Sequence, residues 1–319
     1  MNRDEQIALV LRQLDTTADT KTLRAGLAHR ACRVNARAAE LTAEGLCYEL
    51  ESDLIAAFRR LAGRDHKQDP GCVAKGAIAR ALVTLECLDA AFYREGIVLR
   101  QLEPVWGGSV DTAADVRASC AMGLAASGDA RALITLVDLL ADAEHQARIG
   151  AVRAIVCTEP LAAEAVLRAK VVFGDNESDV IGECLHGLLE LEPDASPQFV
   201  AHLLGDPNPE LAELAALALG ESRLDAGVLL LRAHWEDQPL KRPRDLVLLR
   251  AATLARSDLA FDWLLRLIRE ADPATAEFVV KELSVYHANQ SLATRVESRA
   301  IERDDAALLR LFDMHWHER

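Results

Sequence analysis

The chain has 319 residues, of which half are hydrophobic but only 4% aromatic, and its formal net charge is −14. Sheet proteins rely on β-branched and aromatic residues to pack their strands, whereas this chain is built mainly from Ala, Leu, Arg, Glu and Asp, which favour helices or helix starts. The composition therefore excludes a β-rich fold and predicts an all-α protein.

The negative charge is concentrated in the middle of the chain. Residues 1–110 hold 15 Lys and Arg against 15 Asp and Glu, residues 111–231 hold 7 against 20, and residues 232–319 hold 14 against 15. Nucleic acid requires a cationic surface that displaces counterions from phosphates, so this distribution argues against it. A protein partner with a basic surface suits the middle region. Acidic residues that simply solvate an Ala- and Leu-rich surface would give the same pattern.

The seven cysteines and the first residues indicate a reducing compartment. No two cysteines lie closer than fifteen positions, so the chain holds no CxxC-type metal or redox pair. Residues 1–15 are charged and lack the continuous apolar core of a signal peptide. No uncharged stretch approaches the ~20 apolar residues of a membrane-spanning helix. We therefore expect a cytoplasmic protein that does not bind a membrane.

Helical segments with their own start and stop signals follow one another along the chain. Residues 1–18 are expected to form a helix that caps the front of the array. From Asp115 the pattern is clearest: a helix, a tight turn at Gly128-Asp129, a second helix, and Asp142, which begins the next unit. Asp accepts the free N–H groups at a helix start, and Gly ends helices because it tolerates a left-handed conformation.

The same unit recurs at intervals of 30 to 43 residues. With Val116 as the reference, the equivalent positions are Val34, Val73, Ala147, Val180, Leu211, Leu246 and Ala276. The helix pairs expected after the first clear unit are 145–157 with 160–172, 178–190 with 196–204, 208–219 with 224–234, 245–256 with 258–270, and 273–286 with 289–303. One helix pair cannot bury its apolar stripe alone, so neighbours must stack and share a core. Small residues such as Ala118 and Gly150 are expected where helices approach closely.

The repeated unit resembles the HEAT repeat, especially the short bacterial form shared with phycobilin lyase subunits. Residues 115–142 match best, through Asp115-Val116-Arg117, Gly128-Asp129-Ala130 and the leucines that follow. The resemblance covers roughly residues 30–290. It implies a right-handed α-α superhelix of about eight helix pairs, with second helices on the concave side. Residues 19–303 would form the array, and a helix in residues 304–319 would close its rear.

Two irregular segments interrupt the repeat. Residues 103–111 place Trp106 beside two glycines, and residues 234–245 place Trp235 beside a compact basic cluster. An exposed Trp is a good anchor in a partner's pocket, although Trp106 could instead cover a gap between units. The basic cluster could grip a phosphate or an acidic partner, or it could be a solvated loop that balances charge.

A polar feature also recurs in the second helices. Arginines stand at comparable places, and a histidine replaces them in one unit; these residues are Arg131, Arg168, Arg232, Arg266 and His202. A ridge of arginines would suit bidentate contacts with carboxylate or phosphate. The alternative is pairing within the chain, with acidic residues such as Asp138 or Glu164.

Catalysis has no positive signal in this sequence. There is no Gly-rich phosphate loop, His-Glu-x-x-His helix or Gly-x-Ser-x-Gly elbow, and the terminal His315 and His317 offer too few ligands for a metal. We expect no catalytic residue, no metal and no cofactor.

The expected function is that of a non-enzymatic scaffold or adaptor that binds a protein partner through its concave face and irregular loops. The candidate contact residues are Trp106, Arg131, Arg168, His202, Arg232, Trp235 and Arg266. Proteins that share the HEAT repeat also include chromophore lyase subunits and DNA repair glycosylases, which are the alternatives.

Overall fold

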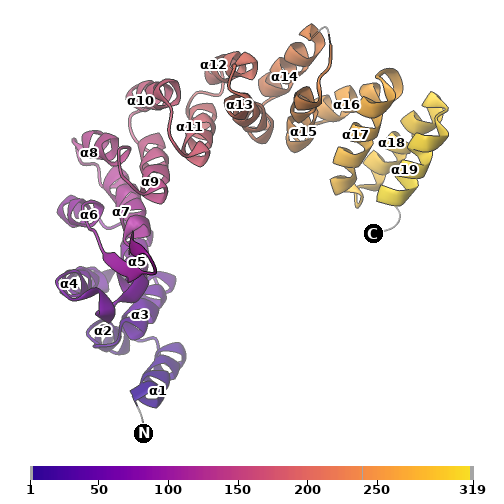
Figure 1. The fold of residues 1–319 in the computed structure, drawn as a ribbon. Helices are drawn as coiled ribbons and strands as arrows, with labels where there is room; N and C mark the ends of the chain where they lie inside the picture. Colours follow the sequence, from indigo (N-terminus) through magenta and orange to yellow (C-terminus); the bar gives the residue numbers. More distant parts are fainter. Residues whose placement is uncertain (1–2, 239, 317–319) are drawn as a thin grey trace. The chain divides into compact units, whose positions relative to one another are not determined.

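The structure is a computed structural model that describes residues 3–238 and 240–316 (Figure 1). Within these residues the chain forms nineteen α-helices, six short 3-10 helices and one two-stranded β-hairpin. Consecutive helices pack as pairs, which confirms the predicted all-α class. None of the described helices is long and apolar enough to cross a membrane.

The chain divides into two compact units, Met1–Val166 and Leu167–Arg319, which we call unit 1 and unit 2. The boundary falls inside α10 (Pro160–Phe173). The other elements of unit 1 are α1 (Arg3–Thr16), α2 (Thr20–Leu27), α3 (Cys32–Glu44), α4 (Glu51–Ala62), α5 (Val73–Thr84), α6 (Ala90–Ile97), β1 (Leu102–Val105), β2 (Gly108–Asp111), α7 (Ala114–Ala126), α8 (Ala132–Leu139) and α9 (His145–Val156).

In unit 1 the odd-numbered helices from α1 to α9 contact one another in series. Each even-numbered helix packs against the odd-numbered helix that follows it, so unit 1 has two layers (Figure 1). Three 3-10 helices lie in its connections, at Tyr48–Leu50, His66–Gln68 and Pro70–Cys72.

Unit 2 has the same arrangement. Its helices are α11 (Ser178–Leu191), α12 (Ser196–His202), α13 (Pro209–Glu221), α14 (Asp225–Asp237), α15 (Leu246–Leu254), α16 (Asp258–Glu270), α17 (Pro273–Leu283), α18 (Gln290–Arg303) and α19 (Ala306–Trp316). Its 3-10 helices are Leu203–Gly205, Pro243–Asp245 and Ser284–Tyr286. The odd-numbered helices contact one another in series, and so do α12, α14, α16 and α18.

The helix bounds follow the start and stop signals of the sequence. Residues 258–270, expected as one helix, are α16. Asp19, Ser257 and Asp272 accept hydrogen bonds from backbone N–H groups in the first turns of α2, α16 and α17, as N-cap residues do. The helices expected at the two ends are α1, which packs against α2 and α3, and α19, which packs against α17 and α18.

The eight reference positions of the repeat lie in the first helices of eight consecutive pairs, from α3 to α17. Five of them are buried, and Leu211 and Leu246 are partly buried. Val73 is half exposed, whereas Ala74 is fully buried, so the repeat position in α5 is Ala74.

Small residues stand where neighbouring helices approach closely. A Cβ atom added to Gly150 of α9 would overlap Ala118 of α7, and one added to Gly220 of α13 would overlap the backbone of Ala251 in α15. Side chains larger than hydrogen at these two glycines would therefore push the helices apart. The expected close contact at Ala118 and Gly150 is confirmed.

Charged groups are buried along one edge of unit 1. Asp69 pairs with Lys75 (2.9 Å), and Asp111 pairs with Arg117 (2.7 Å). The Arg148 guanidinium donates to the backbone carbonyl of Asp142 (2.8 Å). Each Lys or Arg stands six positions after its Asp, near the start of α5, α7 or α9. We call this set the buried ladder, and its regular spacing shows that the three helix pairs are repeats in structure as well as in sequence.

Candidate partner-binding surfaces

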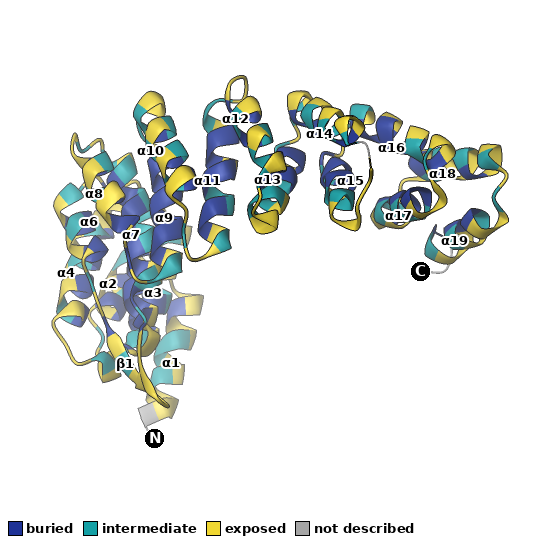
Figure 2. Ribbon diagram, turned by 45° about the horizontal axis from the view of Figure 1, so that its top comes forward, coloured by how far each residue is buried: buried dark blue, intermediate teal, exposed yellow. Residues whose placement is uncertain are grey.

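The segment Glu103–Asp111, expected as an irregular loop, belongs to a β-hairpin that projects from unit 1. Strands β1 and β2 pair antiparallel, with Leu102 opposite Asp111 and Val105 opposite Gly108. The two residues between the strands are Trp106 and Gly107, and Gly107 has φ +88°, a conformation that favours glycine. Figure 2 shows β1 as an exposed element beside the buried helix layers.

The base of the hairpin is tied to the buried ladder. Arg117, which has no solvent exposure, donates to Asp111 (2.7 Å), to Asp142 (2.8 Å) and to the carbonyl of Leu99 (2.9 Å). Arg100 adds a second guanidinium on Asp142 (2.7 Å). One side chain of α7 thus joins the chain before the hairpin, the end of β2 and the start of the next helix pair.

A second group of hydrogen bonds holds the first strand. The Glu103 carboxylate accepts from the Gly71 backbone (2.6 Å), the Thr112 hydroxyl (2.7 Å) and the Gln101 amide (2.8 Å). The same Gln101 amide donates to the Asp69 carbonyl (2.8 Å), so β1 is fastened to the connection before α5. Because polar groups this well bonded have few alternative geometries, the hairpin base is rigid.

These contacts shift the pKa of both carboxyl groups downward. Hydrogen bonds from Gln101 and Thr112 lower the pKa of Glu103. Burial by itself would raise the pKa of Asp111, but the backbone N–H groups of Gln101 and Ala113 and the Arg117 guanidinium outweigh it, and the pKa is lowered. Both groups are therefore held as carboxylates.

The tip of the hairpin is apolar and exposed. The Trp106 side chain is 103% exposed, which means that no described residue covers it. Leu102, Val105 and Val110 are also exposed along the strands. Exposed apolar clusters of this kind often mark interaction sites. The alternative expectation, that Trp106 covers a gap between neighbouring repeats, is not what the structure shows.

Trp235 is the opposite case. Its side chain is 4% exposed, so the ring offers almost no surface to a partner. The Lys241 ammonium lies 5.0 Å from its ring centroid and donates to the backbone carbonyl of Gln238 (2.7 Å). This lysine of the basic cluster therefore folds back onto α14, because the ring quadrupole and the free carbonyls at the helix end both attract a cation.

The predicted arginine ridge is only partly available to a partner. Arg168 stacks on the Phe199 ring at 4.6 Å, and Arg232 pairs with Glu236 (2.7 Å) four residues later on α14. These two side chains follow the alternative of contacts within the chain, and the partner of Arg232 is Glu236 rather than one of the acidic residues expected.

Two further residues of the predicted ridge, Arg131 and His202, are exposed. Arg131 stands at the N-cap position just before α8, where its backbone N–H donates to Asp129 (2.7 Å). His202 ends α12, and its ring nitrogen Nδ1 lies 2.6 Å from the Gln198 carbonyl.

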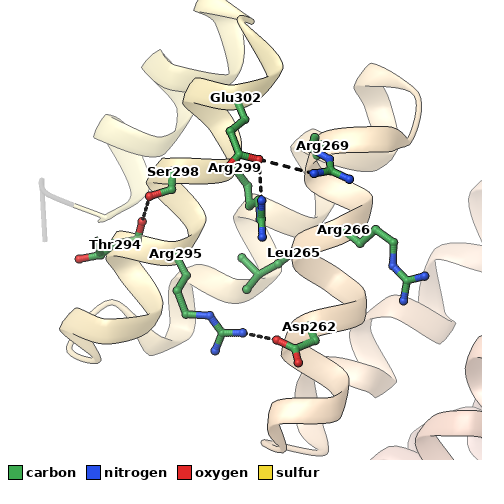
Figure 3. Close-up of a pocket in the computed structure, with 9 residues that line it drawn as sticks. All are labelled: Asp262, Leu265, Arg266, Arg269, Thr294, Arg295, Ser298, Arg299 and Glu302. Atoms are coloured by element: carbon green, nitrogen blue, oxygen red, sulfur yellow. Dashed lines mark hydrogen bonds and ion pairs between the residues drawn. The ribbon is translucent and has the colours of Figure 1, made fainter.

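Arg266 lies in a groove of unit 2 that the sequence did not reveal. The groove has a volume of about 590 Å³ and lies between α16 and α18 (Figure 3). We call it the arginine groove; its lining residues are Asp262, Leu265, Arg266, Arg269, Thr294, Arg295, Ser298, Arg299 and Glu302. Three of its four arginines escaped prediction, because only the packing of α16 against α18 brings the two helices' charged residues together.

No metal site is formed within residues 3–238 and 240–316, where no three His, Cys, Asp or Glu side chains converge. His317 lies outside the described residues, so the terminal His pair is not described. The cysteines described there form no disulfide.

Comparison with known proteins identifies no family for the chain. No protein-family model matches it, and no curated protein matches it. Among solved structures, the chain is similar to the crystal structure of an engineered protein, with 16% identity and a TM-score of 0.38 over 97% of this chain and 90% of the other. The fold described above rests on the packing of this chain's own helices.

Proposed function

We propose that the chain is a HEAT-type repeat protein without catalytic activity, which binds a protein partner through the hairpin of unit 1. The observation that carries the proposal is Trp106, fully exposed at the tip of a hairpin whose base is fixed by buried ion pairs. Trp is enriched among the residues that dominate binding energy at interfaces. The hairpin also costs little conformational entropy on binding, because its base is already ordered.

The chemistry of the tip indicates the contact that a partner would make. Trp106, Val105 and Val110 present an apolar surface, so the complementary feature is an apolar pocket about the size of an indole ring. The HEAT assignment is supported by the motif of residues 115–142 and by the paired helices. The excess of acidic residues in the segment 111–231 favours a partner that also has a basic surface.

The test is affinity capture with the full chain from a native lysate. We expect one protein to be retained by the wild type, and its apparent affinity to fall at least about thirtyfold with Trp106→Ala, as for an interface hot spot. The matched control is Phe173→Ala, which removes another exposed aromatic side chain, at the end of α10. The control should retain the partner like the wild type.

Two results would contradict the proposal. One is that no protein is enriched over a control resin. The other is that Trp106→Ala and Phe173→Ala retain a partner equally well, which would place the interface away from the hairpin.

A further inference from the structure

The arginine groove is a second feature with the properties of a binding site, and it belongs to unit 2. Four guanidinium groups and two carboxylates border it, so the lining itself is cationic although the whole chain carries −14. Two more carboxylates, Asp258 and Glu270, pair with Arg295 and Arg269 from outside the lining. Leu265 contributes an apolar side chain from α16. A cationic lining in an acidic protein attracts anions only locally, which favours a small anionic group over an extended polyanion.

Carboxylates already engage three of the arginines. Arg295 pairs with Asp262, across the groove from α18 to α16. Glu302 pairs with Arg299 (2.5 Å) and with Arg269 (3.8 Å), again bridging the two helices. Figure 3 shows both sets of contacts. These exposed pairs are individually weak, so an incoming anion can exchange with Asp262 or Glu302 at small cost.

Arg266 differs from its neighbours. Among the described residues that border the groove, it is the one arginine that forms no ion pair with a carboxylate, and its side chain is exposed. In Figure 3 its guanidinium points away from α18, on the other side of α16 from the pairs made by Arg295 and Glu302. The groove is therefore bordered by one guanidinium without a carboxylate partner, which must turn toward α18 to meet an anion in the groove, and by three whose present partners are exchangeable.

The walls of the groove are fixed and carry further donors. Arg303 of α18 donates to the carbonyls of Ile268 (3.0 Å) and Ala271 (2.7 Å) at the end of α16, which locks the two helices together. Thr294 and Ser298 now donate to carbonyls of their own helix. Because a hydroxyl can rotate, both can turn to donate to a bound anion.

We propose that the arginine groove binds a phosphate monoester. The ligand must displace Asp262 or Glu302 from their arginines, and a phosphate monoester carries about −1.5 to −2 charge at neutral pH with three acceptor oxygens. A carboxylate brings only one charge and two oxygens, so it would gain little by replacing another carboxylate. Guanidinium groups match phosphate oxygens with paired, charge-assisted hydrogen bonds.

The groove is larger than a phosphate group alone, so we expect the phosphate to be part of a larger molecule. A volume of about 590 Å³ falls in the range of sites for small organic ligands and far exceeds a phosphate group. The carrier is either a phosphorylated side chain in a peptide or a free phosphorylated metabolite. Both sources present the same phosphate monoester, and they are separated by experiment.

The test is calorimetric titration of the full chain at neutral pH and physiological salt. The ligands are a serine-phosphorylated peptide flanked by Ala and Gly, its unphosphorylated form, free O-phosphoserine and inorganic phosphate. We expect the phosphopeptide to bind and its unphosphorylated form not to bind. Equal affinity for free O-phosphoserine assigns the site to a metabolite, and at least tenfold tighter binding of the peptide assigns it to a phosphorylated protein segment.

Variants of the groove give effects of opposite sign. Arg266→Ala should weaken binding at least about tenfold, because it removes a charge-assisted contact. Glu302→Gln should strengthen binding severalfold, because it removes the competitor at Arg299 and the weaker of the two carboxylates at Arg269, the other being Glu270, without removing a cation. Arg310→Ala, an exposed arginine of α19 outside the groove, is the matched control and should leave the affinity unchanged.

The two groove variants should change the affinity for phosphate in opposite directions, so the proposal can be tested even if one of them fails to fold. It is overturned if none of the phosphate ligands binds the wild type. It is also overturned if Glu302→Gln leaves phosphate affinity unchanged while Arg310→Ala lowers it as much as Arg266→Ala does. A short DNA duplex is titrated as a fifth ligand, and its binding without binding of any monoester would assign the groove to nucleic acid instead.

Discussion

Arg117 of unit 1 and the arginines of the groove in unit 2 have opposite surroundings. In unit 1, Arg117 is buried without solvent exposure between Asp111 and Asp142. In unit 2, the arginines of the groove lie at the surface, and their partners are exposed carboxylates. The positions of unit 2 that correspond to Arg117 carry Ile181 and Ala212, six residues after Asp175 and Asp206, so neither aspartate has a cation at the ladder position. The Asp175 side chain, which is 3% exposed, pairs instead with Lys170 of α10 (2.7 Å).

This difference indicates that the buried cation serves the hairpin rather than the stacking of the helices. The first helices of unit 2 stack in series without a buried cation at those positions, so stacking alone does not require it. Burying an ion pair is expensive, and apolar residues often stabilise a fold as well or better. In unit 1 the buried charges coincide with the hairpin, and their effect is to hold its base in one orientation.

The largest effect is expected at the buried cation. Arg117→Met leaves Asp111 and Asp142 buried with one guanidinium fewer, and should lower the free energy of unfolding by about 3–5 kcal/mol. Urea denaturation followed by circular dichroism measures this. Arg24→Met, which breaks an exposed pair with Asp53, is the control and should cost at most about 1 kcal/mol. If Arg117→Met lowers the free energy of unfolding no more than Arg24→Met does, the buried cation of unit 1 does not differ in stability from an exposed pair.

Acid should weaken the hairpin base by a smaller amount. The pKa of Asp111 and of Glu103 is lower in the fold than in the unfolded chain. The stability that these carboxylates contribute is therefore present at neutral pH, and it is lost as the pH falls from about 5 towards their folded pKa values. Urea midpoints at pH 7, 5 and 3 test this: the gap between wild type and Asp111→Asn should narrow as the pH falls. A constant gap would contradict it.

The exposed arginines of unit 2 should contribute little to folding. Arg295→Ala removes a surface pair with Asp262 and should change the free energy of unfolding by at most about 1 kcal/mol. The same denaturation experiment applies, beside Arg117→Met. A loss of 3 kcal/mol or more would mean that the groove arginines hold α16 and α18 together, as the buried ladder holds the hairpin.

The smallest effect is expected at the tip of the hairpin. Trp106 makes no buried contact, so Trp106→Ala should leave the free energy of unfolding within about 0.5 kcal/mol of the wild type. Thermal unfolding of the two proteins side by side is sufficient. A clear destabilisation would show that Trp106 packs against the protein in solution, and its role as an anchor would be lost.

The helices could be predicted because their signals are local. Periodic Ala and Leu residues, Asp at helix starts and Gly at turns lie within a few residues of one another, and they located α16 and its neighbours closely. The segment Glu103–Asp111 was recognised as an interruption of the repeat. Its strands were not, because each has four residues and β1 contains Pro104, so no alternation is visible.

The missed features depend on packing between helices. Asp and Lys or Arg six residues apart recur at 69 and 75, 111 and 117, and 142 and 148, a signal that was present in the sequence but that only its repetition makes recognisable. The arginine groove has no such signal, because residues from α16 and α18 meet only in the folded chain. For the same reason, burial of Trp235 could not be read from the loop that follows it.

The unequal exposure of the four tryptophans has an optical consequence. Trp235, Trp263 and Trp316 are each at most 6% exposed, whereas Trp106 stands in water. Trp106 should therefore emit at longer wavelength than the other three and be the first quenched by a soluble quencher such as iodide or acrylamide. Occupation of the hairpin tip by a partner would shift this emission to the blue and protect it from the quencher, so the unlabelled protein reports on its own binding surface.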